Sequence, residues 1–163
     1  MIFFPDMYYK NVQSIDLKDF EEKNIKGIAI DVDNTLIDYK EDITDEVIEW
    51  VKSVKEAGYK ICILSNSSKK AKVERIANIF KIDYIMDAKK PLKAGFKKAV
   101  QLLDLPIQNI AVIGDQIFTD VWGANKLNMI SVYVEPINKK EFWYTKWKRP
   151  IEALILKKRR NIN

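Results

Sequence analysis

The sequence predicts a three-layer α/β fold, in which helices cover both faces of a mainly parallel sheet. Short apolar runs alternate with amphipathic stretches along the middle of the chain, as in proteins whose parallel strands are joined by helices. Each apolar run is nearly continuous, which is typical of strands that are buried on both faces. The 163 residues, of which 47% are hydrophobic, predict a single domain over 1–163 that includes a C-terminal helical segment at 138–163.

The apolar runs place five strands along the chain, at residues 25–31, 60–64, 84–86, 110–113 and 130–134. Thr44 is suited to cap the helix after the first strand, and Gly58 stands where a left-handed residue ends that helix. We expect Ser67 or Ser68 to cap the second helix, because hydroxyl side chains accept hydrogen bonds from first-turn N–H groups. Pro91 is expected in the first turn of the third helix, where its missing N–H is not needed. A fourth helix lies between the last two strands.

The side chains that are missing exclude several kinds of catalytic site. The chain has no histidine, which excludes a Ser-His-Asp triad, a phosphohistidine intermediate and a zinc site with histidine ligands. Its single cysteine, Cys62, forms no internal disulfide, and residues 63–68 lack the arginine of a cysteine-based phosphatase loop. The chemistry therefore depends on carboxylates, lysines, hydroxyls and amides.

The sequence also predicts a cytoplasmic protein. Residues 1–6 include an apolar patch but lack the basic start and the long apolar core of a secretory signal. No run approaches the ~18 apolar residues that span a bilayer. A single cysteine agrees with a reducing compartment.

Polar side chains follow the predicted strands, at the point where each strand ends. The first strand leads into Asp31, Asp33 and Thr35, the second into Ser65 and Asn66, the third into Lys89 and Lys90, and the fourth into Asp115 and Asp120. The carboxyl ends of parallel strands meet at one edge of a sheet, so we expect these groups to converge there. Carboxylates without a partner are costly to bury, and the cluster therefore requires a cation. Oxygen ligands without histidine or cysteine favour Mg²⁺.

These residue types are suited to phosphoryl transfer. A carboxylate can attack phosphorus and form an aspartyl-phosphate. A metal ion and a lysine can neutralise the phosphoryl oxygens, while a hydroxyl and backbone amides position them. A second acid two residues along an extended segment faces the same way as the first, so it can protonate the leaving group and then activate water.

This set of motifs resembles that of the haloacid dehalogenase (HAD) superfamily of phosphatases. Residues 31–35 match its DxDxT motif, Ser65 its second motif, the pair Lys90-Pro91 its third, and residues 114–120 its fourth, GDxxxTD. Residues 4–8, 34–36 and 114–129, with the basic C-terminal segment, are similar to the YqeG-like family of subfamily IIIA, which is related to phosphatidylglycerophosphate phosphatases. The resemblance covers nearly the whole chain and implies a HAD-like, Rossmann-like fold and a phosphoric monoester hydrolase.

The resemblance also implies a role for each matching residue. Asp31 would be the nucleophile and Asp33 the general acid and base, while Thr35, Ser65, Asn66 and Lys90 would bind the phosphoryl group. Mg²⁺ would be held by Asp31, the backbone carbonyl of Asp33 and Asp115, and Asp120 would support the metal site or Lys90. Of the neighbouring lysines Lys89, Lys90 and Lys93, only the family pattern selects Lys90.

The spacing of the motifs predicts a capless enzyme. Between Asp33 and Ser65 lie 31 residues, and between Ser65 and Lys90 lie 24. A short flap at 37–43 and one helix account for the first interval, and a helix and a strand for the second. An open site of this kind resembles superfamily members that act on large substrates or that borrow a partner as a cap.

The positive charge of the chain is concentrated at its C-terminus. Residues 138–163 hold nine lysines and arginines against two acids, a net charge of +7, whereas residues 1–137 have a net charge of −2. The aromatic residues Phe142, Trp143, Tyr144 and Trp147 are interleaved with these cations. Three interpretations stay open: a helix packed on the body with solvated lysines, an interfacial helix at 139–160 on the anionic inner face of a membrane, or contact with nucleic acid.

The expected function is that of a Mg²⁺-dependent phosphomonoester hydrolase with an Asp31 phosphoenzyme, and a lipid phosphate such as phosphatidylglycerophosphate is one candidate substrate. A receiver-like signalling domain also uses an aspartate, Mg²⁺, a hydroxyl and a lysine. Its phosphorylated aspartate would follow the third strand, where this chain has Asp87 and lysines, so the DxDxT order argues against it. A HAD-fold factor that binds RNA or ribosomes through the basic tail is the remaining alternative.

Overall fold

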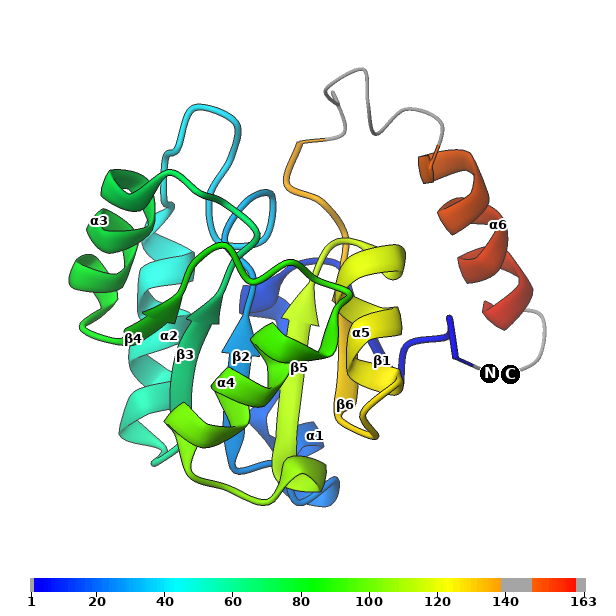
Figure 1. Cartoon of the computed structure of the whole chain (residues 1–163), viewed down its shortest axis with the longest axis horizontal. Coiled ribbons are helices and arrows are strands. Elements are labelled where there is room, and N and C mark those ends of the chain that lie inside the picture. Colours follow the sequence, from blue (N-terminus) through cyan, green and yellow to red (C-terminus); the bar gives the residue numbers. More distant parts are fainter. Residues whose placement is uncertain (1, 139–147, 161–163) are drawn as a thin grey trace.

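A parallel sheet of six strands forms the centre of the molecule in the computed structural model, which describes residues 2–138 and 148–160 (Figure 1). The strands lie in the order β1-β6-β5-β2-β3-β4, and all neighbouring pairs are parallel. Their bounds are β1 (Met7–Tyr9), β2 (Gly27–Ile30), β3 (Lys60–Leu64), β4 (Asp83–Ile85), β5 (Ile110–Gly114) and β6 (Ile130–Val134). The five predicted strands are confirmed, with β5 and β2 at the centre of the sheet.

Strand β1 is a finding that the apolar pattern does not predict. It has three residues at the edge of the sheet and pairs with β6 along its whole length. The Asp6 carboxylate just before it accepts hydrogen bonds from the backbone N–H and the hydroxyl of Ser131, at 2.8 and 3.0 Å. Its three residues include two tyrosines and lie between Asp6 and Lys10, so they do not form an apolar run, and the long-range contacts define the strand.

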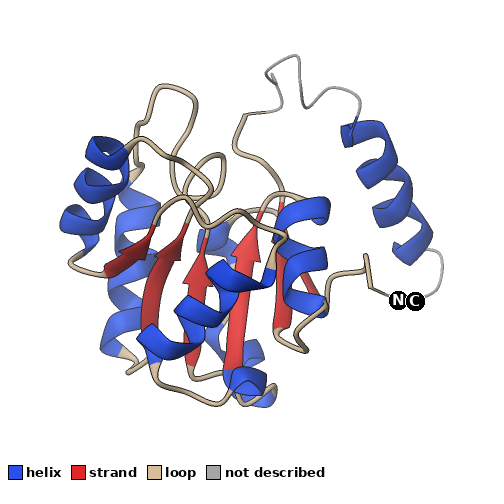
Figure 2. Ribbon diagram, in the orientation of Figure 1, coloured by secondary structure: helices blue, strands red, loops and turns tan. Residues whose placement is uncertain are grey.

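Helices cover both faces of the sheet, so the predicted three-layer α/β fold is confirmed (Figure 2). Their bounds are α1 (Leu17–Glu22), α2 (Asp45–Glu56), α3 (Lys70–Phe80), α4 (Lys93–Leu103), α5 (Trp122–Asn125) and α6 (Lys148–Arg160), with short turns η1 (Val12–Ser14), η2 (Ile107–Asn109) and η3 (Ile117–Val121). Side chains of α1, α2 and α3 pack in one apolar cluster, and those of α4 and α5 pack in a second. Strand side chains alternate between the two clusters, because successive residues of a strand face opposite ways.

The ends of α2 agree with prediction, whereas the start of α3 does not. The Thr44 hydroxyl caps α2, and Gly58 follows that helix with a φ of +88°. Neither Ser67 nor Ser68 caps α3, whose N-cap residue is Lys69. The Ser67 hydroxyl instead accepts a hydrogen bond from the Lys69 N–H at 3.2 Å, within the loop that leads from β3 into α3.

The start of α4 also corrects a prediction. Pro91 lies before α4 and outside its first turn, since the helix begins at Lys93 after the N-cap residue Leu92. The chain between β4 and α4 is tied to the end of β3, where the Ala88 N–H donates to the Ser65 carbonyl at 2.9 Å. Asp87 and Lys89 in this segment have φ values of +46° and +54°, and the Leu92 N–H donates to the Lys89 carbonyl at 2.9 Å, so a turn precedes the helix.

No cap domain interrupts the described chain next to the catalytic motifs. Residues 34–64 hold a loop and α2, and residues 66–89 hold α3 and β4. The expected capless arrangement is therefore confirmed. In residues 2–138 and 148–160, no helix combines the length and the apolar character needed to cross a bilayer.

The C-terminal helix α6 packs beside α5, at the end of the sheet where β6 and β1 lie (Figure 1). Ile155 and Leu156 are partly buried against an apolar cluster that η3 and β6 contribute. Ile151 and Leu154, in contrast, are 45% and 67% exposed. The aromatic residues at 142–147 and the lysines at 139, 140 and 146 lie outside the described residues.

Candidate active site

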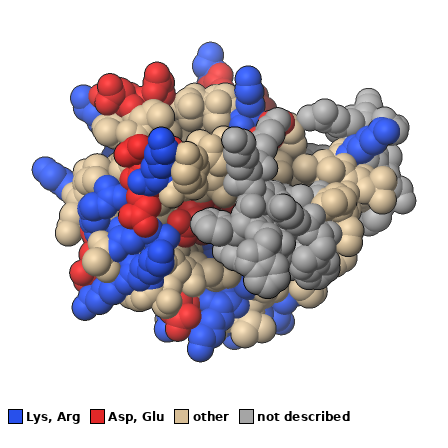
Figure 3. Space-filling view, turned by 90° about the horizontal axis from the view of Figure 1, so that it is seen from above, with Lys and Arg blue, Asp and Glu red and all other residues tan. Residues whose placement is uncertain are grey.

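The carboxyl ends of the central strands bring the predicted site residues together. Asp31 follows β2, Ser65 follows β3 and Asp115 follows β5, and β2 lies between the other two strands. All three side chains are buried, as is that of Lys90 from the loop after β4. Figure 3 looks down on this face and shows acidic side chains among lysines and arginines.

Lys90 joins two of the predicted acids. Its ammonium donates hydrogen bonds to Asp31 Oδ1 at 2.8 Å and to Asp120 Oδ1 at 2.6 Å, and its side chain is 2% exposed. Lys89 and Lys93 are both exposed. Burial and the two ion pairs therefore distinguish Lys90 from the lysines near it, a distinction that composition and spacing leave open.

The electrostatics of this cluster follow from its burial. Burial raises the pKa of Asp31 to about 6, while the charge of Lys90 opposes this shift and that of Asp120 adds to it. Burial alone would lower the pKa of Lys90, but the carboxylates of Asp120 and Asp31 outweigh it and raise that pKa above its ordinary value. Lys90 is thus a permanent cation, whereas Asp31 needs further positive charge to ionise fully at low pH.

Three buried carboxylates form a group that fits a divalent cation. Oxygen atoms of Asp31, Asp115 and Asp120 all lie within 4.8 Å of one another. One lysine cannot balance three buried carboxylates, so the group favours an additional cation. A donor set of oxygen atoms alone is suited to a hard ion such as Mg²⁺.

Asp120 is held where it can serve both Lys90 and this group. Its Oδ2 accepts a hydrogen bond from the Gln116 N–H at 3.1 Å, in addition to the bond from Lys90 to Oδ1. Its carboxylate lies so close to Gly114 that a Cβ atom there would overlap with it. Only glycine permits this approach, which gives a physical reason for the first residue of the GDxxxTD motif.

Three polar residues predicted to bind the phosphoryl group lie on the loops after β2 and β3, Thr35 on the first and Ser65 and Asn66 on the second. Thr35 is 2% exposed, and its Oγ1 has no hydrogen-bond partner among the described residues. The Ser65 hydroxyl accepts the Ser67 N–H at 3.1 Å, which leaves its own proton to donate. The Asn66 carboxamide both donates to and accepts from the backbone of Lys90, at 3.1 and 2.7 Å. The Asn66 side chain therefore holds the backbone of Lys90.

Asp33 differs from the buried acids because it is exposed and paired with a lysine that no motif identifies. Lys72 of α3 donates to Asp33 Oδ1 at 2.6 Å, and the two side chains are 10% and 50% exposed. Lys72 precedes the buried Ile76 by four residues, so it lies at the border of the buried face of α3. That helical spacing is the signal in the sequence from which this contact could have been found.

The comparisons with known proteins agree with the geometry of this site. Residues 39–128 match the family of haloacid dehalogenase-like hydrolases. The chain is 35% identical over 155 residues to "Probable phosphatase YqeG" of Bacillus subtilis (strain 168), and the match covers 94% of this chain and 90% of that protein. The chain belongs to the haloacid dehalogenase-like hydrolases. This membership makes the protein an enzyme of the phosphatase type, as the motifs indicated.

Solved structures share the fold of this hydrolase at low sequence identity. An uncharacterized protein from Listeria monocytogenes serotype 4b is 19% identical and matches with a TM-score of 0.59, over 72% of this chain and 84% of that one. The cobalt-bound deoxy-D-mannose-octulosonate 8-phosphate phosphatase from Haemophilus influenzae is 17% identical and matches with a TM-score of 0.54, over 83% and 89% of the two chains. These likenesses confirm the HAD-like architecture.

Proposed function

We propose that this hydrolase is a Mg²⁺-dependent phosphomonoesterase that acts through a phosphoryl ester of Asp31. The observation that carries the proposal is the position of Asp31, which is buried between the Lys90 ammonium and the carboxylates of Asp115 and Asp120. Asp31, Asp115 and the backbone carbonyl of Asp33 would hold the ion, which would supply positive charge opposite the phosphoryl oxygens. Lys90 holds Oδ1 of Asp31, so we assign Oδ2 as the attacking oxygen.

The reaction divides into two displacements at phosphorus. In the first, Asp31 Oδ2 forms a bond to phosphorus, the bond to the ester oxygen breaks, and Asp33 donates a proton to the departing oxygen. In the second, Asp33 accepts a proton from water as the water oxygen attacks phosphorus, and the bond to Asp31 breaks to release inorganic phosphate. The exposure of Asp33 supports this role, because an exposed acid can reach a leaving group that departs towards solvent.

The remaining polar groups would hold the phosphoryl oxygens during both steps. The Thr35 and Ser65 hydroxyls and the Asn66 backbone N–H supply hydrogen bonds, and Lys90 supplies charge. The hydroxyl of Thr35 is buried without a partner in the described part of the chain, an arrangement that a bound phosphoryl group would satisfy. This set supports an enzyme more than a binding factor that has only retained the fold, because every group that the chemistry requires is in place.

A first experiment measures phosphate release with Mg²⁺ over a panel of substrates. The panel contains phosphatidylglycerophosphate in vesicles, nucleotides, sugar phosphates and an aryl phosphate, with Asp31→Asn as the blank. We expect release above the blank, its loss in EDTA and its return when Mg²⁺ is restored. Release that persists in EDTA would overturn the metal assignment, and no release from any substrate would favour the RNA- or ribosome-binding alternative.

The substrate that we favour is a lipid phosphate at an anionic membrane surface, which would make the protein a peripheral protein of the cytoplasmic face. The site has no cap domain in the described chain, so a large substrate can approach it. On α6, Ile151 and Leu154 are exposed beside the exposed Lys157, within a segment of net charge +7. Apolar side chains combined with lysines are typical of helices that bind anionic bilayers.

Vesicle cosedimentation tests this placement on the full-length protein. We expect binding to vesicles with anionic lipid, weaker binding to neutral vesicles, and a loss of binding in the double variant Ile151→Ser/Leu154→Ser. Activity on the soluble aryl phosphate is the control and stays at the wild-type level. Binding that is unchanged in the double variant and after deletion of residues 139–163 would contradict the membrane proposal.

A further inference from the structure

A buried carboxylate from the C-terminal helix reaches the turn between Asp115 and Asp120, two acids of the candidate metal site. Glu152 of α6 is 3% exposed, and its Oε1 accepts hydrogen bonds from the backbone N–H groups of Ile117 at 2.9 Å and Phe118 at 3.5 Å. Ile117 and Phe118 begin η3, the turn that follows Asp115 and contains Asp120. The partner of this turn therefore comes from a helix more than thirty residues further along the chain.

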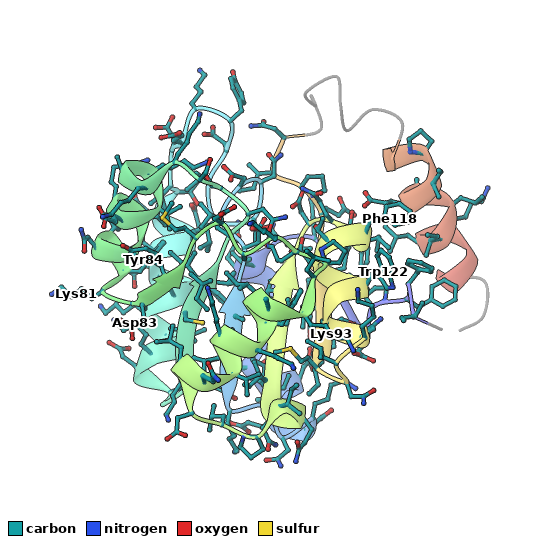
Figure 4. The ribbon with its side chains drawn as sticks, viewed as in Figure 1. Lys81, Asp83, Tyr84, Lys93, Phe118 and Trp122 are labelled. Carbon is teal, nitrogen blue, oxygen red and sulfur yellow. The ribbon has the colours of Figure 1, made fainter. Side chains whose placement is uncertain are left out.

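The rest of the contact surface holds α6 against this turn. Ile155 and Leu156 pack on the cluster that contains Ile117. Figure 4 shows Phe118 and Trp122 on the side of the molecule that faces α6. The Phe3 ring packs against both, with ring centroids 5.7 and 5.4 Å away. Both ends of the described chain thus support the outer side of the turn.

The position of Glu152 suits a group that orients metal ligands. The first N–H groups of a helical turn have no carbonyl partner within the turn. A carboxylate there also interacts favourably with the positive end of the helix dipole. Ile117 lies two residues after Asp115 and three before Asp120. A shift of its N–H would therefore disturb the contact of Asp120 with Lys90 and the spacing of the two carboxylates in the candidate metal site.

We propose that Glu152 is a positioning residue of the active site, which holds the Asp115–Asp120 turn in the geometry that binds the divalent ion. The C-terminal helix is therefore part of the catalytic apparatus as well as an attachment surface. This inference rests on the proposed function, since it concerns the metal site assigned there. Groups that orient metal ligands in this way commonly contribute 10- to 100-fold to metal affinity or activity.

The test compares two substitutions of Glu152 in the full-length protein. Glu152→Ala removes the acceptor, and we expect its Mg²⁺ affinity, measured by calorimetry, to fall by about tenfold or more. Glu152→Gln keeps an oxygen at the same reach, so we expect it to recover most of that loss. Ala153→Gln changes an exposed residue on the same helix and serves as the matched control, with wild-type affinity expected. The rise of Tm on addition of Mg²⁺ provides a second readout and follows the same order.

The outcomes separate this inference from the proposed function. Wild-type Mg²⁺ affinity in folded Glu152→Ala would overturn the positioning role and leave the phosphatase proposal intact. If the alanine variant does not fold, the glutamine variant decides: near wild-type affinity supports the role of the acceptor oxygen, and a loss as large as that of an Asp115→Asn variant refutes it. Wild-type protein that neither binds Mg²⁺ nor releases phosphate would refute the proposed function itself.

Discussion

The candidate active site has a buried half and an exposed half, and each contains a lysine that is paired with one of the proposed catalytic acids. In the buried half, Lys90 bonds Asp31 and Asp120 with side chains that are at most 9% exposed. In the exposed half, Lys72 bonds Asp33, whose side chain is 50% exposed. The distances are similar, but the surroundings differ, and the energy of an ion pair depends on them.

This difference indicates a division of labour. The buried half is held by strand ends and by packing, so it offers one geometry to the phosphoryl group of any substrate. In the exposed half, the Lys72 side chain is 10% exposed but the Asp33 carboxylate is half exposed, so water can replace the contacts that Asp33 loses when it moves. Under the proposed mechanism, we expect this half to accommodate the leaving group and so to influence the choice of substrate. The predictions below test this contrast.

The largest effect is expected from removal of the nucleophile. Asp31→Asn keeps the shape of the side chain but cannot form the phosphoryl ester, so turnover falls by about 10³-fold or more. Phosphate release and circular dichroism together check this prediction, since the fold should be retained. Hydrolysis at the wild-type rate would show that the mechanism assigned to the buried half is wrong.

The second prediction compares how much Lys90 and Lys72 each contribute to the stability of the fold. Lys90→Met leaves buried carboxylates without their cation, and we expect it to lower the free energy of unfolding by about 3–5 kcal/mol. Lys72→Met keeps a similar stem at the rim, and we expect a loss of at most about 1 kcal/mol. Urea denaturation at pH 7 in EDTA measures both. Equal losses would remove the distinction between the two halves.

A third effect concerns the pH dependence of the metal-free protein. Burial raises the pKa of Asp31 to about 6 in the folded state, whereas the ordinary value is 3.8. Between these values the folded protein holds a proton that the unfolded chain has released, so stability falls as pH rises from about 4 to about 6. Asp31→Asn lacks this loss, and its stability relative to wild type should grow by about 1–3 kcal/mol over that interval. Urea denaturation across this range in EDTA measures the difference, and a flat difference curve would contradict the assignment.

The smallest effect is expected at the rim. Lys72→Met should change kcat/KM on a small aryl phosphate by less than about tenfold, because Asp33 stays solvated without its lysine. The effect should shrink further at high ionic strength, which screens exposed charges. Kinetics at low and high salt measure it. A loss comparable to that of Asp31→Asn would place Lys72 in the catalytic apparatus.

Much of the fold was predictable because local patterns determine it. Five strands were visible as apolar runs, and the cap of α2 was visible as Thr44 before an amphipathic stretch. The elements that the sequence did not predict correctly are those whose position depends on contacts between residues far apart in the chain. Strand β1 depends on β6, and α3 and α4 begin late because the loops before them are tied to the ends of neighbouring strands. Propensity cannot show such connections.

The candidate site, like the fold, has features that the sequence predicts and features that depend on distant contacts. The residue types and their order, from Asp31 to Asp120, indicate carboxylate chemistry with a hard cation. The contacts of these residues could not be predicted. Asn66 is expected at the phosphate, and the structure adds that its carboxamide holds the backbone of Lys90. Glu152 looked like an isolated acid in a basic tail, and nothing in its neighbours along the chain indicates its contact with η3.

By itself, the sequence determined the three-layer fold and the set of catalytic groups, because hydrophobic period and residue chemistry are local properties. Only the tertiary structure decided which lysine serves Asp31, which one pairs with Asp33, and which acid supports the turn after β5. Lys90 and Asp31 are 59 residues apart, Lys72 and Asp33 are 39 apart, and Glu152 and Ile117 are 35 apart. Contacts over such separations exist only once the sheet and its helices have packed. The burial of each pair then determines how strongly its charges interact.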